Sequence, residues 1–75
     1  MNDESNTYLP PLTGRKYNLR HERFGRATVK VVRVDGEWAD CEVLSGTLHG
    51  LTDDWGPGDS KCIRITHGVW NPIKG

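Results

Sequence analysis

Hydrophobic and polar residues alternate most regularly between Arg26 and Ser45. Two runs rich in β-branched residues, ATVKVVRV and EWADCEVL, flank the dipeptide Asp35-Gly36. An Asp-Gly pair between two alternating runs is the sequence signature of a β-hairpin. The pattern therefore predicts two antiparallel strands joined by a tight turn at Gly36.

The register of this hairpin decides which side chains face the core. A two-residue turn would pair Val34 with Glu37 and would place Asp40 and Glu42 on the same face as the apolar residues. A three-residue loop with Gly36 in the left-handed conformation would instead pair Arg33 with Glu37. Its further pairs are Val31 with Ala39, Val29 with Cys41, Ala27 with Val43, Val32 with Trp38, Lys30 with Asp40 and Thr28 with Glu42. We expect this glycine-bulge register, because it alone combines a clean apolar face with opposed charges.

The remaining segments predict shorter elements around this hairpin. Residues 15–19 favour a first strand that places Tyr17 and Leu19 on one face, and residues 18–25 favour a polar loop anchored by Phe24. Residues 47–51 favour a short strand with Leu48 facing inward, residues 52–59 a turn cluster, and residues 60–66 a last strand. Residues 67–75 favour a proline-containing tail in which Trp70 caps the core.

The strand pattern predicts an all-β fold. Five short strands, one strong hairpin and glycine-rich turns predict a strongly bent sheet that closes into a small barrel. The strand spacing between Gly14 and Thr66 resembles that of SH3-like and Tudor-like barrels, and the hairpin from Gly25 to Val43 is similar to the strand pair of KOW-type domains. The resemblance implies a five-stranded SH3-like barrel. It implies no ligand, because neither a proline-peptide loop nor an aromatic cage has a counterpart in this sequence.

A chain of 75 residues is long enough for one domain. Residues 1–14 are polar and then proline-interrupted, which predicts a flexible N-terminal tail before a single domain spanning residues 15–75. No apolar run approaches the roughly 20 residues that a membrane-spanning helix needs, so we expect no membrane partner. With no apolar leader after Met1, we expect a cytoplasmic protein that is a monomer or a small homo-oligomer.

The formal net charge of +0 conceals two blocks of opposite sign. Residues 15–33 contain seven Lys and Arg residues and one acid, Glu22, whereas residues 35–59 contain seven acids and no Lys or Arg. Such a chain either neutralises itself on folding or presents two faces of opposite charge. The predicted hairpin opposes Lys30 and Arg33 to acidic residues. We therefore expect a basic edge at residues 15–26 and an acidic turn at Asp53, Asp54 and Asp59 to remain.

Residues that could support catalysis or metal binding are sparse. Cys41 and Cys62 lie in strand-like patterns and are expected to be reduced. The sequence contains neither a C-x-x-C nor an H-x-x-x-H pair, so we expect no metal and no other cofactor. No glycine-rich phosphate loop and no signature of a nucleophile are present, and so small a chain has little room for a dry pocket. We therefore expect no enzyme.

Two binding functions remain open. The first is binding of a protein partner, in which exposed aromatic anchors with a charged rim form an interface; its candidate residues are Val32, Trp38, Lys30, Asp40, Glu42 and Trp55. The alternative is binding of nucleic acid through the segment RKYNLRHERFGR, in which cations alternate with rings that could stack on bases. Its candidate residues are Arg15, Lys16, Tyr17, Arg20, His21, Arg23, Phe24 and Arg26.

We expect the protein-binding function, because a sequence pI near 6.8 is low for a dedicated nucleic-acid domain. A non-catalytic domain of this size is typical of a small regulator, inhibitor or adaptor of a larger complex, such as phage and plasmid genomes encode. The expected partner is a protein, with nucleic acid as the alternative.

Overall fold

The computed structural model describes residues 10–73. Most of the predicted tail, residues 1–9, lies outside the described residues. The rest of it packs on the domain: Pro11 is buried, and the backbone N–H of Leu12 donates a hydrogen bond of 2.8 Å to the hydroxyl of Tyr17. Residues 11 and 12 of the predicted tail therefore contact the domain.

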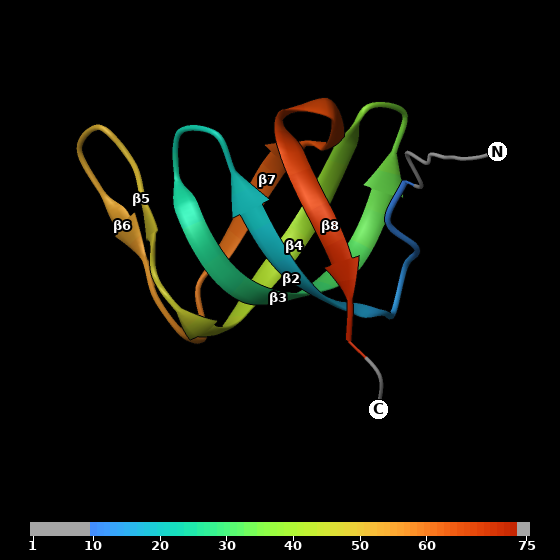
Figure 1. The fold of residues 1–75 in the computed structure, drawn as a ribbon, viewed down its shortest axis with the longest axis horizontal. Helices are drawn as coiled ribbons and strands as arrows, with labels where there is room; N and C mark the ends of the chain where they lie inside the picture. The colour runs from blue at the N-terminus through green and yellow to red at the C-terminus, as the bar shows by residue number, and fades with distance from the viewer. Residues whose placement is uncertain (1–9, 74–75) are drawn as a thin grey trace, which may run out of the picture.

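The described chain is almost entirely β (Figure 1). Its main feature is a five-stranded antiparallel sheet in the order β7-β4-β3-β2-β8. The strands of this sheet are β2 (Lys16–His21), β3 (Gly25–Asp35), β4 (Trp38–Gly46), β7 (Ser60–Arg64) and β8 (Gly68–Pro72). A two-stranded ribbon made of β5 (Leu48–His49) and β6 (Asp54–Trp55) projects from one side of it.

The sheet is strongly bent, because its two edge strands are joined by a very short connection. β7 and β8 lie at opposite edges of the sheet, yet only the 3₁₀ turn η1 (Ile65–His67) links them. Figure 1 shows that the long strand β3 is strongly curved. Among the described strands, however, β7 and β8 share no hydrogen-bonded ladder. The predicted bent sheet is therefore present, and the predicted closure into a barrel is not found.

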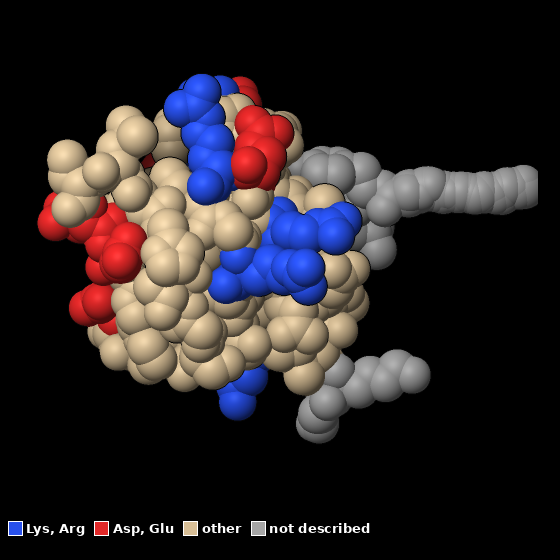
Figure 2. Space-filling view, turned by 60° about the vertical axis from the view of Figure 1, so that its left-hand side comes forward, with Lys and Arg blue, Asp and Glu red and all other residues tan. Residues whose placement is uncertain are grey.

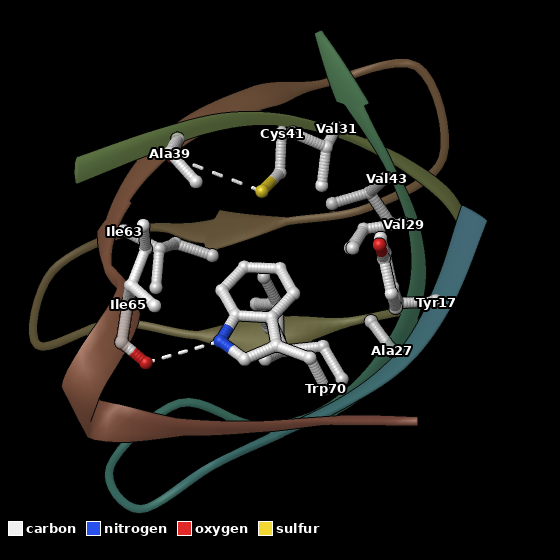
Figure 3. Packing of buried hydrophobic residues seen from close by; sticks show 12 residues of the cluster. Tyr17, Ala27, Val29, Val31, Ala39, Cys41, Val43, Ile63, Ile65 and Trp70 are labelled. Atoms are coloured by element: carbon white, nitrogen blue, oxygen red, sulfur yellow. Dashed lines mark hydrogen bonds between the residues drawn. The ribbon is translucent and has the colours of Figure 1, made fainter. Parts of the chain in front are cut away.

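The concave side of the sheet holds one apolar core (Figure 3). Its buried members are Tyr17, Leu19, Ala27, Val29, Val31, Ala39, Cys41, Val43, Leu48, Ile63, Ile65 and Trp70. The indole N–H of Trp70 donates a 3.0 Å hydrogen bond to the carbonyl of Ile65, and the ring meets Tyr17 edge to face at 5.9 Å. The predicted inward positions of Tyr17, Leu19, Leu48 and Trp70 are confirmed.

The register of the hairpin differs from both predicted registers. Asp35 pairs with Trp38 across a two-residue turn, in which Gly36 has a φ of 61°. The positive φ fits the turn types that match the twist of paired strands. The predicted face of Ala27, Val29 and Val31 is correct, but the residues opposite them are Gly46, Val43 and Cys41.

Two bulges within the strands explain this difference. Val32 is an extra residue on β3 between the pairs that Val31 and Arg33 make, and Leu44 is an extra residue on β4. An extra residue reverses the alternation of side chains between the faces of a strand. The bulge at Val32 thus allows Val34 to pack on the core as well as Val31. The predicted register assumed regular alternation along the whole strand. The bulge breaks this alternation, and Val31 and Val34 both pack on the core.

Three further expectations about the strands were wrong. Residues 18–21 continue β2 as a strand and do not form a loop, with Leu19 and His21 turned inward. Residues 68–72, predicted as a tail, form edge strand β8. The predicted strand at 47–51 contributes only β5, which pairs with β6 outside the main sheet.

The buried side chain of Leu48 anchors the β5–β6 ribbon to the core, and this contact yields a first prediction. Replacing Leu48 by Ala should lower the free energy of unfolding by about 2–5 kcal/mol, the usual cost of a cavity at a buried leucine. Leu51 lies in the same ribbon and is 99% exposed, so Leu51→Ala should change stability by less than about 0.5 kcal/mol. Urea denaturation measures both values. Equal effects of the two substitutions would show that the ribbon does not depend on Leu48.

Candidate functional site

A groove of about 690 Å³ opens at one end of the bent sheet. Five parts of the chain form it: the end of β2 with the turn after it, the start of β4, strand β7, the end of η1, and the end of β5 with the loop after it. Its walls include Phe24 and His21 on one side and Trp38 on another. The bend of the sheet therefore brings together side chains that are more than 25 residues apart in the sequence.

Trp38 is the exposed aromatic residue of this groove. It is 43% exposed, and the guanidinium carbon of Arg64 lies 4.7 Å from the centre of its ring. Arg64 is directly opposite Trp38 in the β4–β7 pair, and its Nη1 also donates a 3.1 Å hydrogen bond to the carboxylate of Glu37. A stacked cation that is itself held by a carboxylate restricts the rotamers of the tryptophan. Trp38 is thus exposed to solvent on the groove side while Arg64 packs against its ring.

A second aromatic cluster supports the groove from the ribbon side. Phe24 stacks on His21 with ring centres 4.1 Å apart and contacts Trp55 at 5.5 Å. The ammonium group of Lys61 lies 4.4 Å from the ring centre of Trp55 and 5.5 Å from that of Phe24. Gly50 fits closely here, because a Cβ atom on it would come within 2.6 Å of the Trp55 ring. The ribbon is thereby locked against the turn between β2 and β3.

His21 holds this turn in place through its Nδ1 atom. Its Nδ1 accepts hydrogen bonds from the backbone N–H groups of Arg23 and Phe24, at 3.0 and 3.1 Å. Burial lowers the pKa of His21 below its usual value, and repulsion from His67 lowers it further. An imidazole that is unprotonated at Nδ1 is the form that can accept both bonds, and the lowered pKa favours this form.

Cationic side chains outnumber acids around the groove. Arg23, Lys61 and Arg64 line it, whereas Glu22 is the single acid in the lining. Nearby, His49 of the ribbon lies 3.3 Å from the carboxylate of Asp54. The groove therefore combines exposed apolar surface with an excess of positive charge, which suits a partner that carries acidic groups.

The two thiols lie on opposite faces of the sheet and cannot bridge. Cys41 is buried in the core, whereas Cys62 is exposed and pairs with Asp40 on the outer face. Burial raises the pKa of the Cys41 thiol to about 12. The pKa of Cys62 is also raised, first by desolvation and then by a hydrogen bond to Asp40. Neither thiol is poised to ionise and act as a nucleophile.

The predicted protein-binding residues are divided among three places. Trp38 lines the groove and Trp55 packs behind it, whereas Val32 and Asp40 line a separate hollow of about 390 Å³. Val32 and Trp38 are both exposed, as expected, but they do not face each other. The last two predicted residues, Lys30 and Glu42, oppose each other across β3 and β4, so the predicted pairing of Lys30 with Asp40 was wrong.

The predicted basic segment is also divided. Tyr17 and His21 point into the domain and are buried, so their rings cannot stack on bases, and this part of the nucleic-acid prediction was wrong. Arg23 and Phe24 belong to the groove, and Arg15 precedes β2. The remaining cations, Lys16, Arg20 and Arg26, are exposed on the outer face of β2 and β3.

The predicted acidic turn is spread over the ribbon and the residues after it, where Asp53, Asp54 and Asp59 are all exposed. Figure 2 shows Lys and Arg side chains near the top, at the centre and at the lower edge of one face, with several Asp and Glu side chains grouped at its left-hand margin and others beside the upper cations. Sorting of charge along the sequence thus persists partly as sorting in space.

Comparison with known proteins identifies no relative: no protein-family model, curated protein or solved structure matches the chain. Within residues 10–73, no group of three or more His, Cys, Asp or Glu side chains is placed to hold a metal ion. No helix in this range is long and apolar enough to cross a membrane.

The sequence pattern did not indicate the contribution of β7 and the ribbon. Lys61, Arg64 and Leu51 all line the groove, yet none of them belonged to a predicted site. The strand at residues 60–66 was recognisable, but which strand it pairs with was not. In the observed register of β4 and β7, Arg64 lies opposite Trp38.

The buried imidazole of His21 yields a prediction about pH. In the interval from its lowered native pKa up to the unfolded value of about 6.5, the unfolded chain binds a proton that the native protein does not. Stability should therefore decrease as the pH falls through this interval. His21→Asn retains an acceptor for the turn but does not titrate, so the variant should lose this part of the pH dependence.

Urea denaturation between about pH 5 and pH 7.5 measures this dependence. The matched control is Leu51→Ala, which changes an exposed side chain without removing an imidazole and should therefore leave the pH profile close to that of the parent protein. An identical profile for the parent and for His21→Asn would contradict the assignment.

Proposed function

We propose that this protein is a non-catalytic, SH3-like binding module whose groove at Trp38 captures a protein partner. The observation that carries the proposal is the exposed indole of Trp38, against whose ring the guanidinium of Arg64 packs. Tryptophan and arginine are the residues most enriched among those that dominate binding energy at interfaces. A side chain that is already ordered also loses less entropy when the partner binds.

The surroundings of Trp38 favour a partner segment with apolar and acidic residues. Leu51 on the ribbon is almost fully exposed, and with Trp38 it offers apolar surface on two sides of the groove. Arg23, Lys61 and Arg64 supply the positive charge around it. Like-signed cations at the rim favour acidic partners and disfavour basic ones.

The SH3-like assignment and the absence of catalysis are parts of the same proposal. A strongly bent, five-stranded antiparallel sheet around one core supports the assignment. The engagement of His21 with backbone N–H groups and the raised pKa values of both thiols support a binding role over a catalytic one. We place this module in the cytoplasm, as a regulator or adaptor of a larger assembly, in keeping with its free cysteines.

Selection from a displayed library of random linear peptides tests the proposal. The peptides recovered should be acidic and carry an aromatic or large aliphatic residue. Trp38→Ala should weaken their binding by about 30-fold, the effect of losing an interface residue worth roughly 2 kcal/mol. Lys61→Glu should also weaken binding of the acidic peptides relative to the parent protein, because it reverses a charge at the rim of the groove.

Val69→Ala is the matched control for the loss of an exposed apolar side chain. Val69 is 49% exposed on β8 and lies outside the groove, so affinity should change by less than about twofold. Isothermal titration calorimetry measures each affinity, and circular dichroism verifies that each variant is folded. Recovery of only basic peptides, or of none whose affinity depends on Trp38, would refute the proposed site.

A further inference from the structure

The outer face of β2 and β3 carries an arrangement of charge that the proposed groove does not use. Lys16 lies directly opposite Lys30 in the β2–β3 pair, and Arg20 lies directly opposite Arg26. All four side chains are exposed. Like charges placed directly opposite each other destabilise a sheet. Two such pairs on one face are therefore unfavourable unless an anion neutralises them.

The residues between these pairs are polar and hydrogen-bonding. Asn18 lies opposite Thr28, whose hydroxyl donates a 2.9 Å hydrogen bond to the side-chain oxygen of Asn18. The row continues on either side, with Asn71 of β8 opposite Asn18 and Ser45 of β4 opposite Thr28. A hollow of about 490 Å³, lined by the polar row and both arginines, occupies this part of the face. The face is thus shaped as well as charged.

Within the described part of the chain, none of the four cations forms an ion pair with an acidic side chain. Glu42 of β4 faces Lys30 across the strands, but within residues 10–73 no ion pair joins them. The nearest residue of β8 to Arg20 is Val69, which is uncharged. The positive charge of this face therefore remains available for a ligand.

From these features we infer that the outer face of β2 and β3 binds the phosphate backbone of double-stranded DNA. The exposed side chains of β2 and β3 on this face are cationic or polar up to Lys30, and none of them is aromatic. Proteins that bind single strands combine cations with aromatic rings on which bases stack. Cations without rings instead contact phosphates, which requires no unstacking of the duplex.

The spacing of the cationic pairs agrees with a duplex. Lys16 and Arg20 are four residues apart on one strand, which at about 3.3 Å per residue places them roughly 13 Å apart. The major groove of B-DNA is about 12 Å wide, so one pair can contact each of the two flanking backbones. Such contacts are independent of base sequence. Binding at this face is also separate from the proposed peptide groove, because Lys16, Arg20, Arg26 and Lys30 lie outside that groove.

Fluorescence anisotropy with a labelled duplex DNA of random sequence tests the inference. Four phosphate contacts predict that the logarithm of affinity falls with the logarithm of salt concentration with a slope near −3.6, about −0.9 per contact. The double variant R20Q/R26Q should bind at least about tenfold more weakly, and its slope should be smaller by about 1.8. The same variant should unfold at a higher urea concentration than the parent, because the repulsion between the two arginines is removed.

The double variant R23Q/K61Q is the matched control. It removes two positive charges from the groove, the same number that R20Q/R26Q removes from the outer face. Its affinity for duplex DNA should remain within about threefold of the parent. Equal losses of affinity for duplex DNA in both double variants would show that binding depends only on the net charge of the protein, and would overturn the inference. So would the absence of duplex binding at low salt, or tighter binding of the single strand that depends on Trp38. The peptide experiments test the groove residues Trp38 and Lys61, whereas the DNA experiments test Arg20 and Arg26 on the outer face. Failure of either proposal therefore leaves the other standing.

Discussion

The architecture of this domain depends on one short connection. Only three residues, Ile65–His67, join β7 to β8, although these strands form opposite edges of the sheet. The sheet must therefore bend until its edges approach each other, and bending encloses the apolar side of every strand around a single core. The hydrogen bond from the Trp70 indole to the Ile65 carbonyl fastens this turn to the core. For so short a chain, one shared core is the main source of stability.

Bending also determines where the polar residues lie. Alternation along each strand sends one set of side chains inward and the other outward, so the outer face of β2 and β3 is basic while β4 contributes Asp40 and Glu42 beside it. At one end of the sheet, the turn held by His21 meets β7 and the ribbon, and a groove remains between them. The two proposed binding surfaces are thus products of the same curvature, one on the outer face and one at the end.

Much of the fold was predictable because burial follows local alternation. The inward positions of Tyr17, Leu19 and Leu48 and the left-handed Gly36 required only the pattern around them. The register was not predictable in the same way. The bulge at Val32 lets Val34 pack on the core, and the residues of that core lie on several strands. Of the candidate site, Trp38 was recognised as an exposed aromatic residue. Arg64, which packs against its ring, was missed because the sequence alone does not show which residues lie opposite each other on paired strands.

The sequence by itself determined the class of structure, the central hairpin, the apolar face of its strands and the separation of charge into two blocks. These properties depend on neighbours one or two residues away, and local steric preferences and alternation specify them. Tertiary structure alone decided that residues 68–72 complete the sheet, that the basic segment is divided between a groove and an open face, and that Tyr17 and His21 are buried. Those outcomes depend on which strands pair, and pairing is chosen by the free energy of enclosing one common core.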